Sequence, residues 1–320
     1  MADDSIKRRE FLKLTGKAAL LGAFLGGGEL LLSKNNYKPY QPPAKNLSGK
    51  KNITLDSAFP DLVSVKSANH AGAAVAAIGF IGGIGRFISK GDIVTIKPNI
   101  GWDRSPELAA NTNPDLVKAI ALQCLNAGAK KVIVTDVSCN DPRECFPRSG
   151  IRAILKDTGV DVILPEDRDF INADLKGEIL SVWPVLKYFL ETDKLINMPI
   201  VKHHSLTHIT CTMKNWFGVL GGARNRLHQK IDLSIADLAD FFRPTLVVVD
   251  ATRVLVRNGP VGGNPSDVEI HDTVIVSTDQ VAADSYACRF LNLDPENVGH
   301  ITTAEKRGLG KIKGYSIKES

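Results

Sequence analysis

Residues 112–136, TNPDLVKAIALQCLNAGAKKVIVTD, decide the fold, because a helix pattern there leads directly into a strand pattern. The segment opens with capping residues, a proline and then Asp115, an order that is typical of a helix N-terminus. Apolar residues recur with helical spacing until Gly128, and residues 131–135 then form a β-branched run. Because a similar run at residues 92–97 precedes the helix, we predict a strand–helix–strand unit of an α/β fold.

Strand and helix patterns continue on both sides of this unit. Short apolar runs predict strands at residues 62–66, 161–164, 193–201, 246–249 and 274–277, with a β-excursion within 178–190. Helical patterns cover residues 71–81, 149–158, 235–242 and 281–291. We therefore predict an α/β fold with a mainly parallel sheet flanked by helices, in two lobes, with a cleft at the carboxyl ends of the strands.

Polar side chains follow several of the predicted strands at the point where each strand ends. They are Lys97 and Asn99, Asp136, His203 and His204, and Asp250. In a parallel sheet the carboxyl ends of the strands lie on one side, which is where open α/β sheets bind their ligands. We therefore expect these side chains to share one cleft.

Residues 201–222, VKHHSLTHITCTMKNWFGVLGG, contain the densest group of such side chains. Three of the seven histidines, His203, His204 and His208, fall within six residues, and Lys214 follows before a glycine-rich turn. His204 and His208 would share a face if a helix had started by that point, and Lys214 would lie on one face of a helix over residues 209–217.

These residue types suit two kinds of chemistry. Neutral imidazoles are good ligands for transition metals, and a carboxylate can complete the set. The predicted metal ligands are His203, His204, His208 and Asp250. Histidine and lysine are equally suited to proton transfer near neutral pH. The predicted catalytic residues are His204, Lys214 and Asp136.

Other side chains of the same segments suit an anion. Lys97, Lys202 and Lys214 would supply positive charge for a carboxylate or a phosphate, and asparagines would add directional hydrogen bonds. The residues predicted to bind a cofactor or a small anionic ligand are Lys97, Asn99, Lys202, Asn215 and His228. The identity of the cofactor stays open, with a transition metal as one option.

Composition argues against several classes of protein. The net charge of +5 comes from scattered residues without an aromatic-interleaved basic stripe, which argues against a nucleic-acid partner. The five cysteines contain no C-x-x-C pair, which argues against an iron–sulfur cluster and a zinc ribbon. Cys139 and Cys145 could form a disulfide, but their spacing alone leaves the pairing open. Neither G-x-S-x-G nor a P-loop motif occurs.

The N-terminus carries an export pattern. Residues 7–13, KRREFLK, resemble the twin-arginine motif, and the Gly- and Ala-rich apolar residues 18–32 are typical of a signal h-region rather than of a membrane span. We expect the twin-arginine export machinery as a partner and a periplasmic or other extracytoplasmic location. Because no A-x-A site follows, an uncleaved signal could also anchor the chain to the membrane, its one expected membrane contact.

This reading divides the chain into four parts. They are a signal segment at residues 1–34, a linker at 35–55, an α/β domain at 56–312 and a C-terminal tail at 313–320. The linker is rich in proline and polar residues, and the α/β domain contains every candidate site residue.

Motifs spread along the chain match one known family. They are KPN at 97–99, TNP at 112–114, GAKK at 128–131 with Asp136, residues 202–222, Asp250 with NGP at 258–260, and TDQVAAD at 278–284. Together they resemble the domain-of-unknown-function family 362 over residues 62–310. The resemblance implies a fold more than an activity. Many members carry a ferredoxin-like cluster domain, for which this chain has no cysteine run.

The central segment also resembles, more remotely, lactate racemase and its relatives. Those proteins hold a nickel-pincer nucleotide with a histidine and, ten residues on, a lysine in a Gly-rich segment. His204 and Lys214 have this spacing, residues 218–222 supply glycines, and His228 lies roughly where that group places another histidine. The resemblance implies a metal-bearing cofactor at these side chains.

Two functions follow from these observations. The first is an exported enzyme, dependent on a metal or another cofactor, that acts on a small anionic substrate by proton or hydride movement, as an oxidoreductase or an isomerase of the racemase kind. The second is a non-catalytic exported protein that binds an anion or a metal for a redox partner. An acid–base pair in a closed cleft would favour the enzyme, and an open cleft with dispersed groups would favour binding.

Overall fold

A computed structural model describes residues 56–320, and these residues fall in one compact unit. The predicted signal segment and linker, residues 1–34 and 35–55, lie outside the described part. No helix of the described part combines the length and hydrophobicity needed to cross a membrane.

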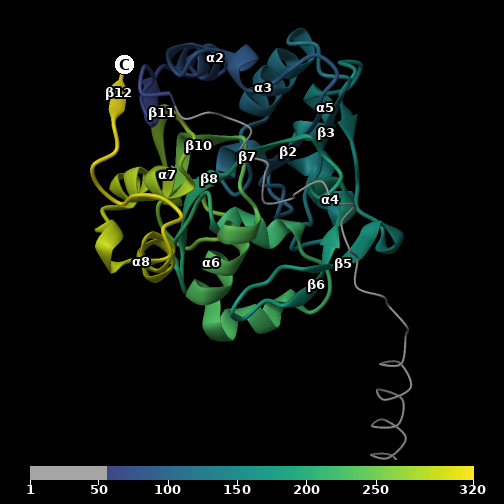
Figure 1. Cartoon of the computed structure of the whole chain (residues 1–320), viewed down its shortest axis with the longest axis vertical. Helices are drawn as coiled ribbons and strands as arrows, with labels where there is room; N and C mark the ends of the chain where they lie inside the picture. Colours follow the sequence, from purple (N-terminus) through teal and green to yellow (C-terminus); the bar gives the residue numbers. More distant parts are fainter. Residues whose placement is uncertain (1–55) are drawn as a thin grey trace, which may run out of the picture. The chain divides into compact units, whose positions relative to one another are not determined.

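Within residues 56–320, ten strands form one sheet (Figure 1). Along the sheet they are β12 (Ile317–Glu319), β1 (Leu62–Lys66), β11 (Val268–Ser277), β10 (Leu246–Leu255), β7 (Lys194–Met198), β2 (Ile93–Pro98), β3 (Lys131–Val134) and β4 (Asp161–Val162), with β8 (Ile200–His204) and β9 (His208–Thr210) branching from β10. Neighbours from β10 to β4 are parallel, whereas β11 is antiparallel to β10 and β1. The C-terminal residues, expected as a tail, include β12, which pairs with β1.

Helices cover both faces of the sheet (Figure 1). One face carries α2 (His70–Phe80), α3 (Pro114–Asn126), α4 (Pro142–Arg148) and α5 (Ile151–Ile154), and the other carries α6 (Ile231–Phe241), α7 (Gln280–Ala287) and α8 (Gly299–Lys306). Alternate strand residues supply the two cores, since Val248 packs on the α2 side and Val249 on the α6 side. The α/β fold with a mainly parallel sheet flanked by helices is confirmed.

Smaller elements complete the described part. A separate hairpin of β5 (Phe170–Asp174) and β6 (Val182–Leu186) packs on the α6 side. β6 lies within the expected β-excursion at residues 178–190, whereas β5 precedes it. Short 3-10 helices cover Ile84–Arg86, Pro106–Leu108, Asp167–Asp169, Lys187–Phe189, Lys214–Val219 (η6), Arg224–Lys230 (η7), Pro265–Asp267, Cys288–Leu291 and Pro295–Asn297. The two labelled 3-10 helices form part of the candidate site.

The strand–helix–strand unit forms as its sequence predicts. The Asn113 side chain caps α3 by accepting a hydrogen bond from the backbone N–H of Asp115 at 3.0 Å. Gly128, with φ of 90°, ends the helix in a conformation that only glycine adopts without strain. β2 and β3 then pair in parallel, with Ile93 opposite Lys131. Their carboxyl ends therefore lie on one side of the sheet.

The segment at residues 193–201, expected as one strand, forms two. Pro199 has no N–H to donate to a neighbouring strand, and the segment breaks there into β7 and β8. β7 pairs with β2 and the start of β10, whereas β8 pairs further along β10. β10 runs on to Leu255, beyond the expected end at residue 249, so Asp250 lies inside a strand rather than after one.

The helices considered for residues 204–208 and 209–217 are not formed. β8 and β9 make an antiparallel hairpin in which His204 lies opposite His208, and His208 has a left-handed φ of 64°. The chain leaves β9 at Thr210 and reaches Lys214 as the first residue of η6. His204 and Lys214 therefore approach the same region from a strand end and a 3-10 helix.

Candidate functional site

A cavity of about 290 Å³ lies at the carboxyl ends of β2, β3 and β8. Its walls come from these strand ends and from η6 and η7. Eight of the predicted site residues line it: Lys97, Asn99, Asp136, Lys202, His204, Lys214, Asn215 and His228. The five residues on or just after β2, β3 and β8 come together because the carboxyl ends of parallel strands meet on one side of a sheet, and η6 and η7 add the other three.

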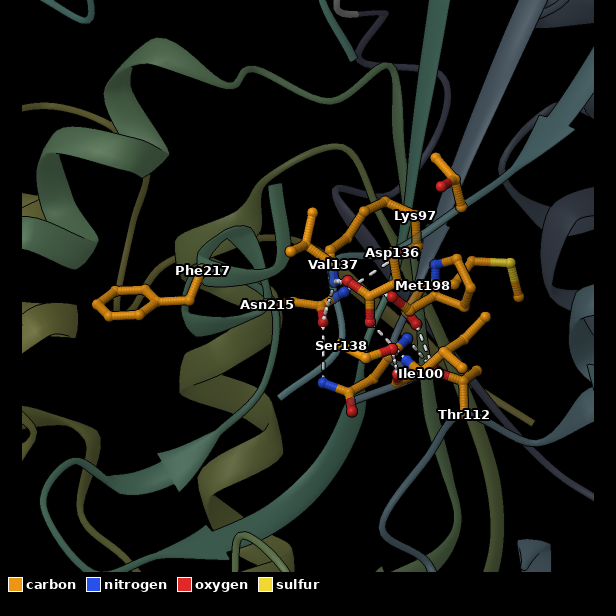
Figure 2. A network of polar contacts seen from close by, with 12 residues as sticks. Lys97, Ile100, Thr112, Asp136, Val137, Ser138, Met198, Asn215 and Phe217 are labelled. Carbon is orange, nitrogen blue, oxygen red and sulfur yellow. Dashed lines mark hydrogen bonds and ion pairs between the residues drawn. The ribbon is translucent and has the colours of Figure 1, made fainter. Parts of the chain in front are cut away.

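A buried ion pair forms the floor of the cavity. Lys97 Nζ lies 2.7 Å from Asp136 Oδ1, and the two side chains are 1% and 2% exposed. The ammonium group also donates to the carbonyl of Pro98 at 2.8 Å and to Asn215 Oδ1 at 2.9 Å (Figure 2). Burial lowers the pKa of Lys97 below its ordinary value, and the Asp136 carboxylate opposes that shift. Such a pair is costly to break, because either partner alone would be a buried unpaired charge.

Gly218 lets η6 pack directly against this pair. A Cβ atom added at Gly218 would lie 2.1 Å from Asp136 Oδ1 and 2.6 Å from Lys97 Nζ. The amide of Asn215 accepts from Lys97 and from Asn99 Nδ2 at 3.0 Å, and it donates to the Lys97 carbonyl at 3.2 Å. These contacts fix η6 on the ends of β2 and β3.

Asp284 of α7 holds the two residues that precede Lys214 in the sequence. Its buried carboxylate accepts the backbone N–H of Thr212 at 2.6 Å and that of Met213 at 3.1 Å. Burial raises the pKa of Asp284, and the neighbouring His300 opposes that shift. The sequence pattern placed Asp284 only in a helix, although its motif, TDQVAAD at 278–284, is among those that resemble the known family.

Two further lysines are buried in the wall of the cavity. Lys202 Nζ donates to Asn99 Oδ1 at 3.2 Å and to the Ala110 carbonyl at 2.5 Å. Lys214 Nζ lies 3.6 Å from the centroid of the Phe217 ring. Within the described residues, neither ammonium group forms an ion pair with a carboxylate of its own. Burial, the largest cause, lowers the pKa of each lysine to about 7.

Arg224 adds a fourth cation that the sequence pattern did not single out. Its guanidinium donates to the carbonyls of Val137 at 2.8 Å, Phe217 at 3.0 Å and Ser138 at 2.5 Å, and it lies 3.6 Å from Cys139 Sγ. The described residues that line the cavity therefore include four lysine and arginine side chains but only one carboxylate, that of Asp136. The excess of positive charge favours an anionic ligand.

The two histidines of the cavity are held by the backbone. His204 Nδ1 accepts the N–H of Leu206 at 3.1 Å and that of Thr207 at 3.4 Å. Burial, followed by the nearby Lys214, lowers the pKa of His204 to about 3, so the ring is neutral at physiological pH. His228 Nδ1 lies 3.0 Å from the carbonyl oxygen of Asn225, and burial lowers the pKa of this ring as well.

The side chains predicted to bind a metal do not come together. His203 and His204 alternate along β8, so they point to opposite faces, and His208 is exposed. Asp250 accepts the backbone N–H of Asn113 at 2.8 Å and is not among the cavity residues. Among the described residues, no group of three or more His, Cys, Asp or Glu side chains is placed to hold a metal. The structure does not bring the four predicted ligands together, because a hairpin replaces the expected helix.

A nickel cofactor held by His204 does not fit this arrangement either. The Nδ1 lone pair of the ring already accepts two backbone N–H groups, so the single proton of the neutral ring lies on Nε2 and neither nitrogen has a lone pair for a metal.

Cys139 is exposed, Cys145 is buried, and both are free thiols in the structure.

Comparison with known proteins adds the family. A thylakoid-associated protein of Synechocystis sp. is 25% identical over 237 residues, which cover 72% of each chain. The lactate racemase apoprotein of Thermoanaerobacterium thermosaccharolyticum superposes with a TM-score of 0.42 at 12% identity, over 74% of this chain and 58% of that one. A Thermotoga maritima protein superposes with a TM-score of 0.37 at 10% identity, over 71% of this chain and 60% of that one. This chain thus spans less than two thirds of both solved chains.

The family model described as "Domain of unknown function (DUF362)" matches residues 94–289. The matched region runs from β2 to just past α7, so it includes every residue that lines the cavity. Because the match covers more than half of the sequence, the chain belongs to the DUF362 family.

Proposed function

We propose that this cavity binds a small anion, a carboxylate or a phosphate, and exchanges a proton with it. The observation that carries the proposal is the burial of Lys202 and Lys214 without carboxylate partners among the described residues. A buried ammonium group costs free energy unless an anion accompanies it, and a bound ligand would supply that anion.

The lowered pKa values support the proton-transfer part of the proposal. A lysine with a pKa of about 7 is present in both protonation states near neutral pH, whereas an ordinary lysine stays protonated. Lys214 can therefore donate a proton to a bound ligand or accept one from it. The proposal assigns no step to a metal, since the predicted ligands lie apart.

We also propose that the chain works outside the cytoplasm. Residues 7–13 and the apolar residues 18–32, which lie outside the described part, support export by their pattern alone. The proposed activity and the proposed location rest on different residues, so either can fail without the other.

Calorimetric titration with sulfate and with acetate tests the binding, because neither anion changes its charge between about pH 6 and about pH 9. A lysine with a pKa of about 7 is roughly 1% protonated at pH 9, so affinity that depends on its charge should fall up to about 100-fold. Lys214→Met should weaken binding at pH 6, whereas Lys130→Met, at an exposed lysine beside the amino end of β3, should not. Equal affinity at both pH values, or in Lys214→Met, would contradict the proposal.

Proton transfer needs a separate measurement. The wild-type chain is incubated in deuterium oxide with a panel of small carboxylates, and solvent deuterium in their C–H positions is followed by proton NMR. Exchange that is lost in Lys214→Met supports the enzyme. Binding without exchange in any member of the panel would instead leave a non-catalytic anion-binding protein.

A further inference from the structure

We infer that the two histidines of the cavity hold opposite, fixed tautomers. His204 presents its Nε2–H as a hydrogen-bond donor, and His228 presents an unprotonated Nε2 that can accept a proton in addition to Lys214. The inference deepens the proposed function and rests on it for the class of ligand, but each tautomer follows from backbone contacts alone.

The tautomer of His204 is set by the turn that joins β8 to β9. Backbone N–H groups can only donate, and two of them, from Leu206 and Thr207, point at Nδ1 at 3.1 and 3.4 Å. Nδ1 must therefore keep its lone pair, and the single proton of the neutral ring lies on Nε2. Because His204 lines the cavity and its Nε2 makes no hydrogen bond within residues 56–320, this N–H is available to a ligand.

The tautomer of His228 is set in the opposite sense. A carbonyl oxygen can only accept, and Asn225 places one 3.0 Å from Nδ1. The proton of the neutral ring therefore lies on Nδ1, and Nε2 keeps its lone pair. The His228 ring packs edge-on against Phe217, with 5.6 Å between the ring centroids, and the face of Phe217 carries the ammonium group of Lys214.

The two tautomers give the two histidines different roles toward a bound ligand. An oxygen of the bound anion accepts the Nε2–H of His204, and an acidic proton of the same ligand can pass to Nε2 of His228. In that step the electron pair of the broken bond stays on the ligand, and His228 becomes an imidazolium that later returns the proton. His204 cannot take this role, since its outward nitrogen already carries a hydrogen.

The same assignment explains why a metal does not suit His204. A neutral histidine that ligates through Nε2 needs its proton on Nδ1, usually donated to a carbonyl or a carboxylate. The turn at Leu206 and Thr207 offers donors at that place instead of acceptors. His204 is therefore a donor to the anion in this chain, contrary to the expectation from lactate racemase-like spacing.

Long-range proton–nitrogen NMR of the full chain, labelled with ¹⁵N-histidine and free of added anion, tests both tautomers at about pH 7. His204→Gln and His228→Gln identify the two sets of ring signals by their loss. We expect the ring proton on Nε2 of His204 and on Nδ1 of His228. The reverse tautomer at either ring would overturn the inference, whatever the chain binds.

Affinity for acetate tests the donor role. The amide of a glutamine can place an N–H close to the position of Nε2, whereas alanine cannot. We expect His204→Ala to weaken binding about 10-fold or more and His204→Gln to recover most of the loss, as for one hydrogen bond to a charged acceptor. Equal losses in the two variants would refute the donor role. Wild-type chain that shows the expected tautomers but binds no acetate or sulfate would instead contradict the proposed function.

Discussion

Replacing Lys214 with methionine should stabilise the anion-free protein while it removes the proposed ligand contact. The ammonium group is buried against the Phe217 ring and has no carboxylate partner among the described residues. Its pKa is about 7 in the folded chain, against an ordinary value of 10.5. Folding at low pH must therefore bury a charge that water would stabilise, and methionine fills a similar volume without that charge.

The size of the effect follows from the shift in pKa. The unfolded chain binds more protons than the folded chain between about pH 7 and pH 10.5, so wild-type stability rises with pH in that window. A pKa of about 7 in place of 10.5 corresponds to a penalty of about 5 kcal/mol for the charged group below pH 7. Losing the contact with the Phe217 ring lowers the stability of the variant by about 1–2 kcal/mol. We therefore expect Lys214→Met to raise the free energy of unfolding by about 3 kcal/mol at pH 6 and by little at pH 10.

Urea denaturation at these two pH values, in chloride buffers without sulfate or carboxylates, measures the difference. Omitting such anions matters, because a bound anion would itself stabilise the wild-type chain. Lys130→Met is the matched control, since it removes an exposed lysine and should leave the free energy of unfolding nearly unchanged. If Lys214→Met is no more stable than the wild-type chain at pH 6, the lysine is not buried as a costly charge, and the reasoning is refuted.

Other changes test other parts of the structure. Asp136→Asn leaves Lys97 charged and unpaired in the interior, so the free energy of unfolding at pH 7 should fall by about 3–5 kcal/mol in urea denaturation; a loss below about 1 kcal/mol would speak against a buried pair. Gly218→Ala places a Cβ 2.1 Å from Asp136 Oδ1 and should cost about 1–3 kcal/mol, so an unchanged thermal midpoint would disprove the close approach. Replacing Arg8 and Arg9 together by lysine should retain the chain in the cytoplasm, as cell fractionation would show, and undiminished export would contradict the proposed signal.

Much of the fold could be predicted because its elements are local. α3 carries its own cap, its apolar face and its closing glycine, and β1 forms over the expected residues 62–66. Once the strands are parallel, geometry alone brings their carboxyl ends together. Lys97, Asp136 and His204 could therefore be placed in one site before any contact was known.

The features that the sequence did not reveal depend on contacts between distant segments. A spacing of four between His204 and His208 suits either a helix or a tight hairpin, and pairing with β10 decides for the hairpin. Arg224 enters the site because η7 folds back over the residues after β3, 86 positions earlier at Ser138. Ring tautomers cannot be read from sequence either, since they depend on whether a backbone donor or acceptor faces Nδ1.

The ring of cations around the cavity has a kinetic consequence. Charges of one sign in a concave site with apolar walls concentrate the electric field at its mouth and attract oppositely charged solutes from a distance. Salt screens this attraction over about 10 Å at 0.1 M ionic strength, so the association rate of an anion should fall as salt rises. Because Lys202 and Lys214 gain their charge near pH 7, a small acidification of the surroundings would speed capture. The association rate of the proposed anion should therefore be highest at low pH and low ionic strength.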